Sequence, residues 1–284
     1  MSDQGSQAGD GTQPDANTGV ELPVDPPVTY EVADGVATIT LNRPEQRNIL
    51  TAESMAGVSA ALVKADEDPA VRVVVLTGTG PAFCAGADLR GASASDADSF
   101  AQQGPAALVS LLGQLLDFDK PTIARVQGHV AGGGNGLVAE CDLAVAAEDA
   151  KFAFSEVRVG VAPAVISVPC LRKMSTADAY ELLLTGERVS AARVQQAGLV
   201  NRVAPADELD AAVGEYVRQL RAGGPMALAW TKELLRRVPS TPRDEAFAWA
   251  SELSARLFSS DEAKAGMEAF LSRQPAPWAS DEGA

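Results

Sequence analysis

The sequence predicts an α/β fold with a helical C-terminal region, and three observations support this prediction. Between residues 28 and 146, runs rich in Val, Ile and Leu alternate with segments of helical periodicity, as expected around a parallel sheet. Two glycine-rich loops follow predicted strands, and after Val203 only helical patterns remain. We therefore expect a disordered tail over residues 1–27, an α/β core over 28–206 and a helical region over 207–284.

The predicted tail is acidic. Residues 1–27 contain no Lys or Arg, and their five acids account for five of the 15 net negative charges of the chain. A segment rich in Gly, Pro, Gln, Asp and Thr cannot bury enough apolar surface to order itself. We expect it to have no catalytic part.

The core begins with a predicted hairpin. Residues 29–32 and 36–41 have strand-like patterns and are separated by the turn residues 33–35. After a loop over 42–48, Thr51 suits the N-cap of a helix that ends at Asp68-Pro69. The β-branched run at 71–76 then predicts a strand that is covered on both faces.

The same order of elements recurs along the next 70 residues. We expect a loop over 78–90, a helix over 106–116, a strand over 122–126, a helix over 133–141 and a strand over 142–146. Loops that follow parallel strands gather at one edge of a sheet, so a binding site is expected there.

The C-terminal third is predicted to be helical. One helix spans 207–221 and another spans 225–238, separated by Gly223-Gly224 and Pro225. Met226, Trp230 and Leu234 form an apolar stripe that suits either internal packing or a docking surface. Ser259 and Glu262 have capping-box spacing before a last helix that ends near Leu271.

Composition excludes several functional classes. The net charge of −15 argues against nucleic acid and anionic membranes as partners. The chain has neither an apolar run long enough to span a bilayer nor a signal-peptide pattern at its start. Its three widely spaced cysteines indicate reduced, buried thiols and a cytoplasmic location. The single histidine, His129, argues against a histidine metal site or a catalytic triad, and we expect it to be packed or solvent-facing.

The run Gly132–Gly136 carries the first chemical signal. Glycines at the start of a helix leave N–H groups unobstructed, and the helix dipole adds partial positive charge. Such a place can hold an oxygen that becomes negative during a reaction, and Glu156 would then act as an acid or base beside it. Neither glycine loop completes the dinucleotide pattern G-x-G-x-x-G, because Phe83 and Leu137 occupy the third glycine positions.

The segment Phe83–Leu89 resembles the F-x-A-G-A-D-[LI] signature of the crotonase family, the enoyl-CoA hydratases and isomerases. Other segments match that family in order and spacing: 42–44, 120–124, 132–134, 141–142, 152–156, 184–186 and 197–200. The resemblance covers residues 28–271, and 152–167 looks most like bacterial hydratases that act on short or branched enoyl-CoAs. It implies a core of β-β-α units in two roughly perpendicular sheets. It also implies C-terminal helices that build a homotrimer, with trimers pairing into hexamers.

The resemblance also implies roles for individual residues. The backbone N–H groups of Ala87 and Gly133 would form an oxyanion hole, and Glu156 matches one of two glutamates with which hydratases hold and activate water. The CoA moiety would lie along Arg47, Asn48, Ile49, Ala85, Asp88 and Leu89. Arg47 and Arg90 would contact its phosphates or remain solvated surface charges.

The chain departs from the family pattern at Gly136, where hydratases carry their other glutamate and where the substrate would lie. Two arrangements would compensate for the missing carboxylate. Glu140, one helical turn later, would reach back over Gly136, unless it makes a local structural contact. Alternatively, Glu156 would act alone, as in isomerases and in some bacterial members with a single glutamate. Asn135 is suited either to position a water or to cap the loop.

These observations predict an enzyme of fatty acid metabolism that adds water to a trans-2-enoyl-CoA. Two alternatives remain, a Δ3-to-Δ2 enoyl-CoA isomerase and a homologue that binds acyl-CoA without turning it over. No metal or redox cofactor is expected, since CoA enters as part of the thioester substrate. An RNA-binding role is disfavoured by the acidic composition.

Overall fold

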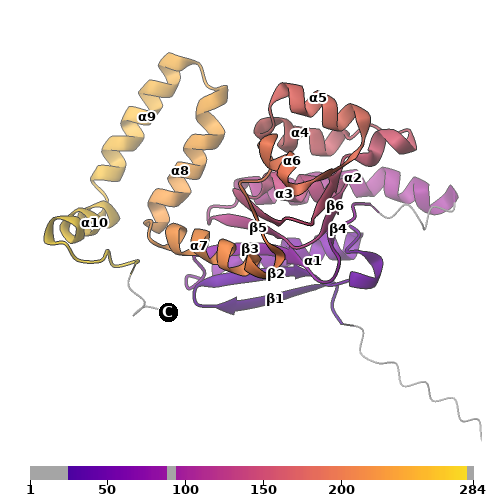
Figure 1. The fold of residues 1–284 in the computed structure, drawn as a ribbon. Helices are drawn as coiled ribbons and strands as arrows, with labels where there is room; N and C mark the ends of the chain where they lie inside the picture. The colour runs from indigo at the N-terminus through magenta and orange to yellow at the C-terminus, as the bar shows by residue number, and fades with distance from the viewer. Residues whose placement is uncertain (1–24, 88–93, 280–284) are drawn as a thin grey trace, which may run out of the picture.

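Two β-sheets and the helices around them form the fold (Figure 1). The computed structural model describes residues 25–87 and 94–279, so most of the predicted tail lies outside the described part. The larger sheet has the strand order β1-β2-β3-β5-β7-β10, and the smaller one has the order β4-β6-β8-β9. This arrangement confirms the predicted α/β class.

The larger sheet begins with the predicted hairpin. Strands β1 and β2 pair antiparallel around Asp34 and Gly35, whose positive φ angles of 49° and 70° suit a tight hairpin turn. The other strands continue the sheet parallel to β2, and β3 is buried along its whole length, as predicted. The bounds are β1 Val28–Ala33, β2 Val36–Leu41, β3 Val73–Gly78, β5 Thr122–Val126, β7 Leu143–Ala147 and β10 Arg202–Ala204.

The smaller sheet corresponds to the second sheet that the family resemblance implies, but its individual strands are absent from the prediction by residue patterns. Its strands are β4 Ala82–Cys84, β6 His129–Ala131, β8 Lys151–Ala153 and β9 Arg188–Ser190. The first three are parallel, and β9 pairs antiparallel with β8. Three residues are too few for an alternating pattern to emerge, so the segments containing β4 and β6 were predicted as loops.

Helices cover the sheets and bury one large apolar core between them. Helix α1 begins after Thr51, which forms a reciprocal capping box with Ser54. Helix α2 is longer than the predicted 106–116 and contains Pro105. The helices of the core are α1 Ala52–Glu67, α2 Ala94–Asp117, α3 Gly133–Glu140, α4 Ala164–Lys173, α5 Thr176–Thr185 and α6 Ala191–Gln196. Short 3-10 helices η1 Pro44–Gln46 and η2 Ser155–Val159 interrupt the loops.

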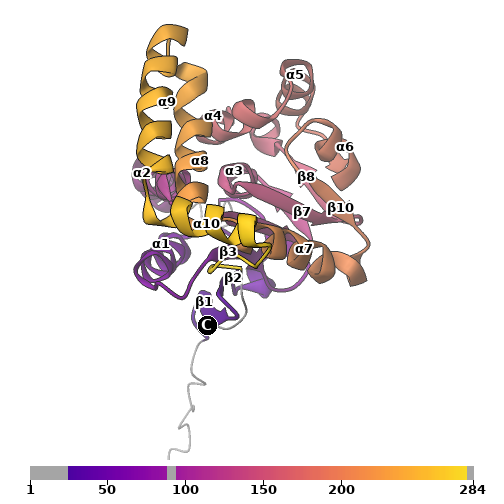
Figure 2. The ribbon, with the colours of Figure 1, turned by 90° about the vertical axis from the view of Figure 1, so that its left-hand side faces the viewer.

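The chain ends in further helices, as predicted. Helix α7 packs against the larger sheet over a second apolar cluster that includes Val73 and Ile123. The helices α8, α9 and α10, here called the C-terminal lobe, extend away from the core (Figure 1), with α8 and α9 side by side (Figure 2). The bounds are η3 Ala206–Glu208, α7 Leu209–Arg221, α8 Pro225–Arg237, η4 Val238–Ser240, α9 Arg243–Phe258 and α10 Asp261–Ser272.

The predicted N-cap of the last helix, α10, is wrong by one residue. Helix α10 is capped by Ser260, whose Oγ accepts a hydrogen bond from the Ala263 N–H at 3.1 Å, and not by Ser259. Glu262 instead accepts hydrogen bonds from the first-turn N–H groups of Met226 and Ala227 in α8, each at 2.9 Å. Its negative charge at that helix N-terminus favours the local dipole and joins α10 to α8.

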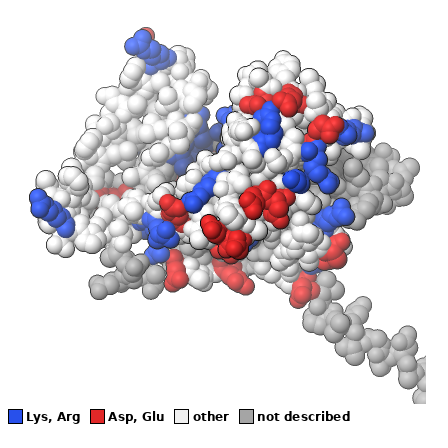
Figure 3. Space-filling view, in the orientation of Figure 1, with Lys and Arg blue, Asp and Glu red and all other residues white. Residues whose placement is uncertain are grey.

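The lobe has few charged side chains on the face shown in Figure 3. The predicted stripe of Met226, Trp230 and Leu234 is half-buried, and the Arg256 guanidinium lies 4.4 Å from the Trp230 ring centre. No helix within 25–87 or 94–279 is long and apolar enough to cross a membrane.

Candidate active site

Three predicted catalytic residues follow three neighbouring strands of the smaller sheet. Ala87 lies three residues after β4, Gly133 two residues after β6, and Glu156 three residues after β8. Because these strands are adjacent and parallel, their carboxyl ends meet at one edge of the sheet. The fold therefore brings together residues separated by up to 69 positions in the chain.

Two glycines let the first two loops touch through their backbones. Gly86 has a φ of 83°, and a Cβ there would lie 2.9 Å from the Ala131 carbonyl oxygen and 3.2 Å from the Gly132 Cα. Gly132 has a φ of 50°, and its Cβ would lie 3.5 Å from the Gly86 Cα. Only glycine combines these conformations with so close an approach. Ala87 and Gly133 each follow directly after this contact.

Gly133 begins α3, as predicted. The N-cap residue is Gly132, and no side chain caps this helix start. A Cβ added at Gly133 would lie 2.7 Å from Leu50 Cδ1 and 3.4 Å from Leu108 Cδ2, so two leucine side chains cover this position. A helix N-terminus beside hydrocarbon stabilises a developing negative charge more strongly than one in water.

Glu156 lies on η2 and points its carboxylate toward the glycine loop. Its Oε1 is 3.7 Å from the place that a Gly132 Cβ would occupy. Its Oε2 is buried and has no hydrogen-bond partner among the described residues. Burial raises the pKa of the Glu156 carboxyl, and a hydrogen bond from the backbone partly opposes this shift. A carboxyl group whose pKa is raised in this way suits proton transfer closer to neutral pH.

The segment predicted to lie along CoA runs beside the Ala87 loop. The Leu50 N–H donates to the Gly86 carbonyl at 2.8 Å, and the Ala85 N–H donates to the Arg47 carbonyl at 3.0 Å. Arg47 is exposed, and Ile49 is buried. Three residues predicted for CoA, Asp88, Leu89 and Arg90, lie outside the described residues.

Asn48 has a structural function that sequence reasoning missed. Its side chain accepts a hydrogen bond from the Arg43 N–H at 2.8 Å and donates to the carbonyls of Thr79 and Ala82 at 2.9 and 2.8 Å. The side chain is buried and makes all three bonds within the protein. It therefore shapes the loop, which leaves the backbone of this segment as the candidate contact for CoA.

Hydrocarbon surrounds Gly136, where the family pattern has its second glutamate. A Cβ at Gly136 would lie 3.0 Å from Ile166 Cγ2 and 3.3 Å from Leu112 Cδ1. These side chains come from α4 and α2, and both are buried. A carboxylate at position 136 would meet apolar groups in the present packing.

Glu140 makes the local contact that was one of its two predicted alternatives. Its side chain is buried, with Oε2 3.5 Å from Arg172 Nη1. Burial raises the pKa of the Glu140 carboxyl, and the charges of Arg172 and Lys173 oppose that rise. The carboxylate is thus paired at the carboxyl end of α3, whereas Gly133 lies at the opposite end of that helix.

The cysteines and the histidine lie where the sequence predicted. Cys84, Cys141 and Cys170 are buried and unpaired. His129 is exposed at the amino end of β6, away from the end that leads to Gly133. Within the described ranges, no group of three His, Cys, Asp or Glu side chains is placed to hold a metal ion.

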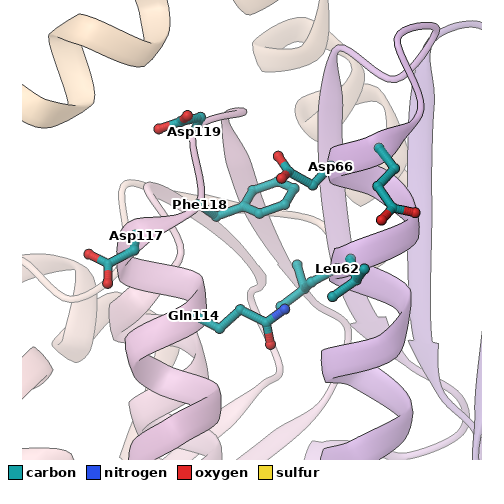
Figure 4. A pocket seen from close by; sticks show the side chains of 8 residues that line it. Leu62, Asp66, Gln114, Asp117, Phe118 and Asp119 are labelled. Carbon is teal, nitrogen blue, oxygen red and sulfur yellow. The ribbon is translucent and has the colours of Figure 1, made fainter.

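A surface pocket lies between the carboxyl ends of α1 and α2 (Figure 4). Helices α1 and α2 return the chain to the amino ends of β3 and β5. The pocket therefore lies at the edge of the larger sheet opposite to the loops that follow those strands. The residues labelled in Figure 4 are Leu62, Asp66, Gln114, Asp117, Phe118 and Asp119, and none was predicted to belong to the active site.

Comparisons with known proteins identify the family of this chain. A family model described as enoyl-CoA hydratase/isomerase matches residues 31–281. The chain therefore belongs to the enoyl-CoA hydratase/isomerase family, the crotonases. Over 241 residues it is 35% identical to an enoyl-CoA hydratase of Mycobacterium tuberculosis, which covers 83% of this chain and 90% of the relative.

A second relative and a solved structure extend the comparison. A carnitinyl-CoA dehydratase of Salmonella typhi is 33% identical over 251 residues, covering 86% of this chain and 94% of the relative. The crystal structure of an enoyl-CoA hydratase from Mycobacterium smegmatis matches with a TM-score of 0.85 at 35% identity. That match covers 90% of this chain and 100% of the other. The fold class predicted from the sequence is thus confirmed as crotonase-like.

The close contact between the glycine loops predicts the effect of adding one methyl group. Gly86→Ala should lower the free energy of unfolding by about 1–3 kcal/mol, because the new Cβ meets backbone and φ is positive. Turnover should fall with it, because Ala87 is displaced. Gly113→Ala, in α2 with nothing within 4 Å of its Cβ, is the control and should gain about 0.5–1 kcal/mol. Urea denaturation that ranks the two variants equally would contradict the prediction.

The buried carboxyl of Glu156 predicts a gain in stability when it is neutralised. Its folded-state pKa is raised, so its favourable contribution is present at low pH and is lost as pH rises through that pKa. Glu156→Gln should therefore be more stable than the parent above the raised pKa, and the difference should shrink as pH falls. Urea denaturation across a pH series measures this, with Glu268→Gln at an exposed carboxylate as the control. A Glu156→Gln variant less stable at every pH would contradict the prediction.

Proposed function

We propose that this protein adds water to a trans-2-enoyl-CoA, with Ala87 and Gly133 as oxyanion donors and Glu156 as the acid and base. The observation that carries the proposal is the convergence of all three residues at the carboxyl edge of the smaller sheet. Family membership and relatives named as enoyl-CoA hydratases support an acyl-CoA thioester as the substrate.

The proposed reaction requires that one negatively charged oxygen be stabilised and that one side chain transfer a proton. Glu156 takes a proton from water while the water oxygen bonds to C3 of the substrate. The electron pair of the C2–C3 double bond moves toward the thioester, whose carbonyl oxygen becomes negative beside the N–H groups of Ala87 and Gly133. Glu156 then returns its proton to C2, so that one water is added and the enzyme is restored.

The apolar surroundings of Gly136 favour chemistry with a single carboxylate. They also support one alternative reaction, the isomerisation of a 3-enoyl-CoA to a 2-enoyl-CoA. There Glu156 would remove a proton from C2, and the same oxyanion donors would hold the dienolate. The proton would return to C4, with no water needed. The third possibility is binding of acyl-CoA without turnover.

Turnover of matched substrates distinguishes these functions. With 2-enoyl-CoA and 3-enoyl-CoA supplied separately over several chain lengths, we expect a 3-hydroxyacyl-CoA from the former. Glu156→Gln should lower kcat by about 10²–10⁴, because one general acid or base is typically worth that much. Glu140→Gln is the matched control and should keep its kcat, since that carboxylate is paired with Arg172.

Each other result of this experiment has a definite meaning. Conversion of 3-enoyl-CoA alone would replace hydration by isomerisation. Binding of CoA thioesters without product would leave only a binding protein, and full activity of Glu156→Gln would remove Glu156 from the mechanism. A large loss of kcat in Glu140→Gln would give Glu140 a part in the reaction.

A homotrimer or hexamer and a cytoplasmic location complete the proposal. The C-terminal lobe supports self-association, because only Leu253 of α9 and Ala269 of α10 are buried within one chain. Large apolar side chains of the lobe are instead exposed, among them Phe247 at 65%, Phe258 at 68% and Phe270 at 83%. The three unpaired, buried cysteines support a reducing compartment.

Light scattering at micromolar concentration tests the oligomer. We expect the mass of a trimer or a hexamer, and we expect Phe247→Asp to shift it toward the monomer, because a charge would be buried in the interface. Val63→Asp, at an exposed apolar position on α1, is the control. A parent protein that is monomeric under these conditions would disprove self-association.

A further inference from the structure

We infer that Asn135 is a positioning residue. Through its hydrogen bond to the Ala153 carbonyl, it fixes the position of the Gly133 N–H relative to the Glu156 carboxylate. This inference rests on the proposed function, because it concerns the geometry of the same reaction. It assigns to Asn135 a function distinct from water binding and from capping the loop.

The first observation is a pair of hydrogen bonds to one oxygen. Asn135 is fully buried, and its Nδ2 donates to the Ala153 carbonyl at 2.8 Å. The Gly132 N–H donates to the same oxygen at 3.3 Å. Because Gly132 and Asn135 stand on either side of Gly133 in the sequence, the two bonds tie down the loop that carries the oxyanion donor.

The second observation is where the sheet ends. The last paired residues of β6 and β8 are Ala131 and Ala153, so no further strand pairing joins the two segments beyond them. Gly133 and Glu156 both lie just past this end. The Asn135 side chain adds a hydrogen bond where the backbone ladder stops. It therefore couples the start of α3 to the segment leading into Glu156.

The third observation concerns the oxygen of the Asn135 side-chain amide. Its Oδ1 is buried and has no hydrogen-bond partner among the described residues, and Glu156 Oε2 is in the same condition. Buried amide oxygens in proteins are nearly always paired, since an unpaired one is destabilising. An apolar side chain of similar size would avoid this penalty. The amide thus offers one donor to Ala153 at the penalty of one unpaired oxygen, which fits a function in positioning that bond.

The test uses Asn135→Leu, which keeps the branched shape and the number of heavy atoms of the side chain and removes both the donor and the unpaired oxygen. We expect kcat for the proposed reaction to fall by about 10- to 100-fold, because small misplacements of reacting groups have effects of this size. KM should stay the same, since the segment along CoA is not altered, and thermal stability should be retained. Asn135→Ser, a smaller residue that keeps a donor, is the second variant and should recover part of the lost kcat.

A spectroscopic readout separates positioning from folding. An enoyl-CoA conjugated to an aromatic ring absorbs at longer wavelength when hydrogen bonds polarise its carbonyl. The parent should show this red shift on binding, and Asn135→Leu should show a smaller one at full saturation. Asn201→Ala removes a 2.8 Å side-chain hydrogen bond from the Ala144 N–H in β7, and it serves as the control for a lost bond outside the site.

The outcomes distinguish this inference from the proposed function. A parent without red shift or turnover would overturn the proposed function itself. A working parent whose Asn135→Leu and Asn135→Ser variants keep the full red shift and kcat would overturn the inference alone. Losses of kcat that follow thermal stability in both variants and in Asn201→Ala would also overturn it, because Asn135 would then be only structural.

Discussion

The contact between Gly86 and Gly132 is the constraint on which the site depends. It brings the backbones of two different loops into contact. A side chain at Gly86 would meet the Ala131 carbonyl at 2.9 Å, and the positive φ at both positions disfavours residues other than glycine. Ala87 and Gly133 each lie one residue beyond the contact, and Glu156 Oε1 lies near the Gly132 side of it. The proposed oxyanion donors are thus positioned by backbone packing, which is more rigid than positioning by long side chains.

The site contains groups that are unfavourable in the folded state. Glu156 has a raised pKa because its carboxylate is poorly solvated, and the Asn135 amide oxygen is buried without a partner. The surrounding core can offset such penalties, because it packs the smaller sheet against α3 and α4 with fully buried residues such as Phe152 and Phe154. Local strain of this kind is typical where a structure prepares for chemistry.

The sequence predicted the longer strands of the larger sheet, but not helices α4, α5 and α9 or the three-residue strands. Strands β2, β3 and β5, the hairpin turn and the Thr51 cap follow from periodicity and turn chemistry over five or more residues. The residue patterns missed the individual strands of the smaller sheet, because these have three residues each and form only through tertiary contacts. Ala87, Gly133 and Glu156 could nevertheless be named as site candidates, because sequence motifs mark them even when the strands that precede them are not predicted.

The sequence does not show which side chains pack against position 136, where the second glutamate of the family pattern is absent. Gly136 shows that a carboxylate is absent, yet only the packing shows Ile166 and Leu112 against that position. The distinction matters for mechanism, because an open polar space would favour a replacement for the lost carboxylate, whereas hydrocarbon disfavours any second charge. Glu140 lies one turn away and is paired with Arg172. The proposed reaction therefore relies on a single carboxylate that accepts a proton and then donates it, so it depends on the placement of Glu156 relative to Gly133.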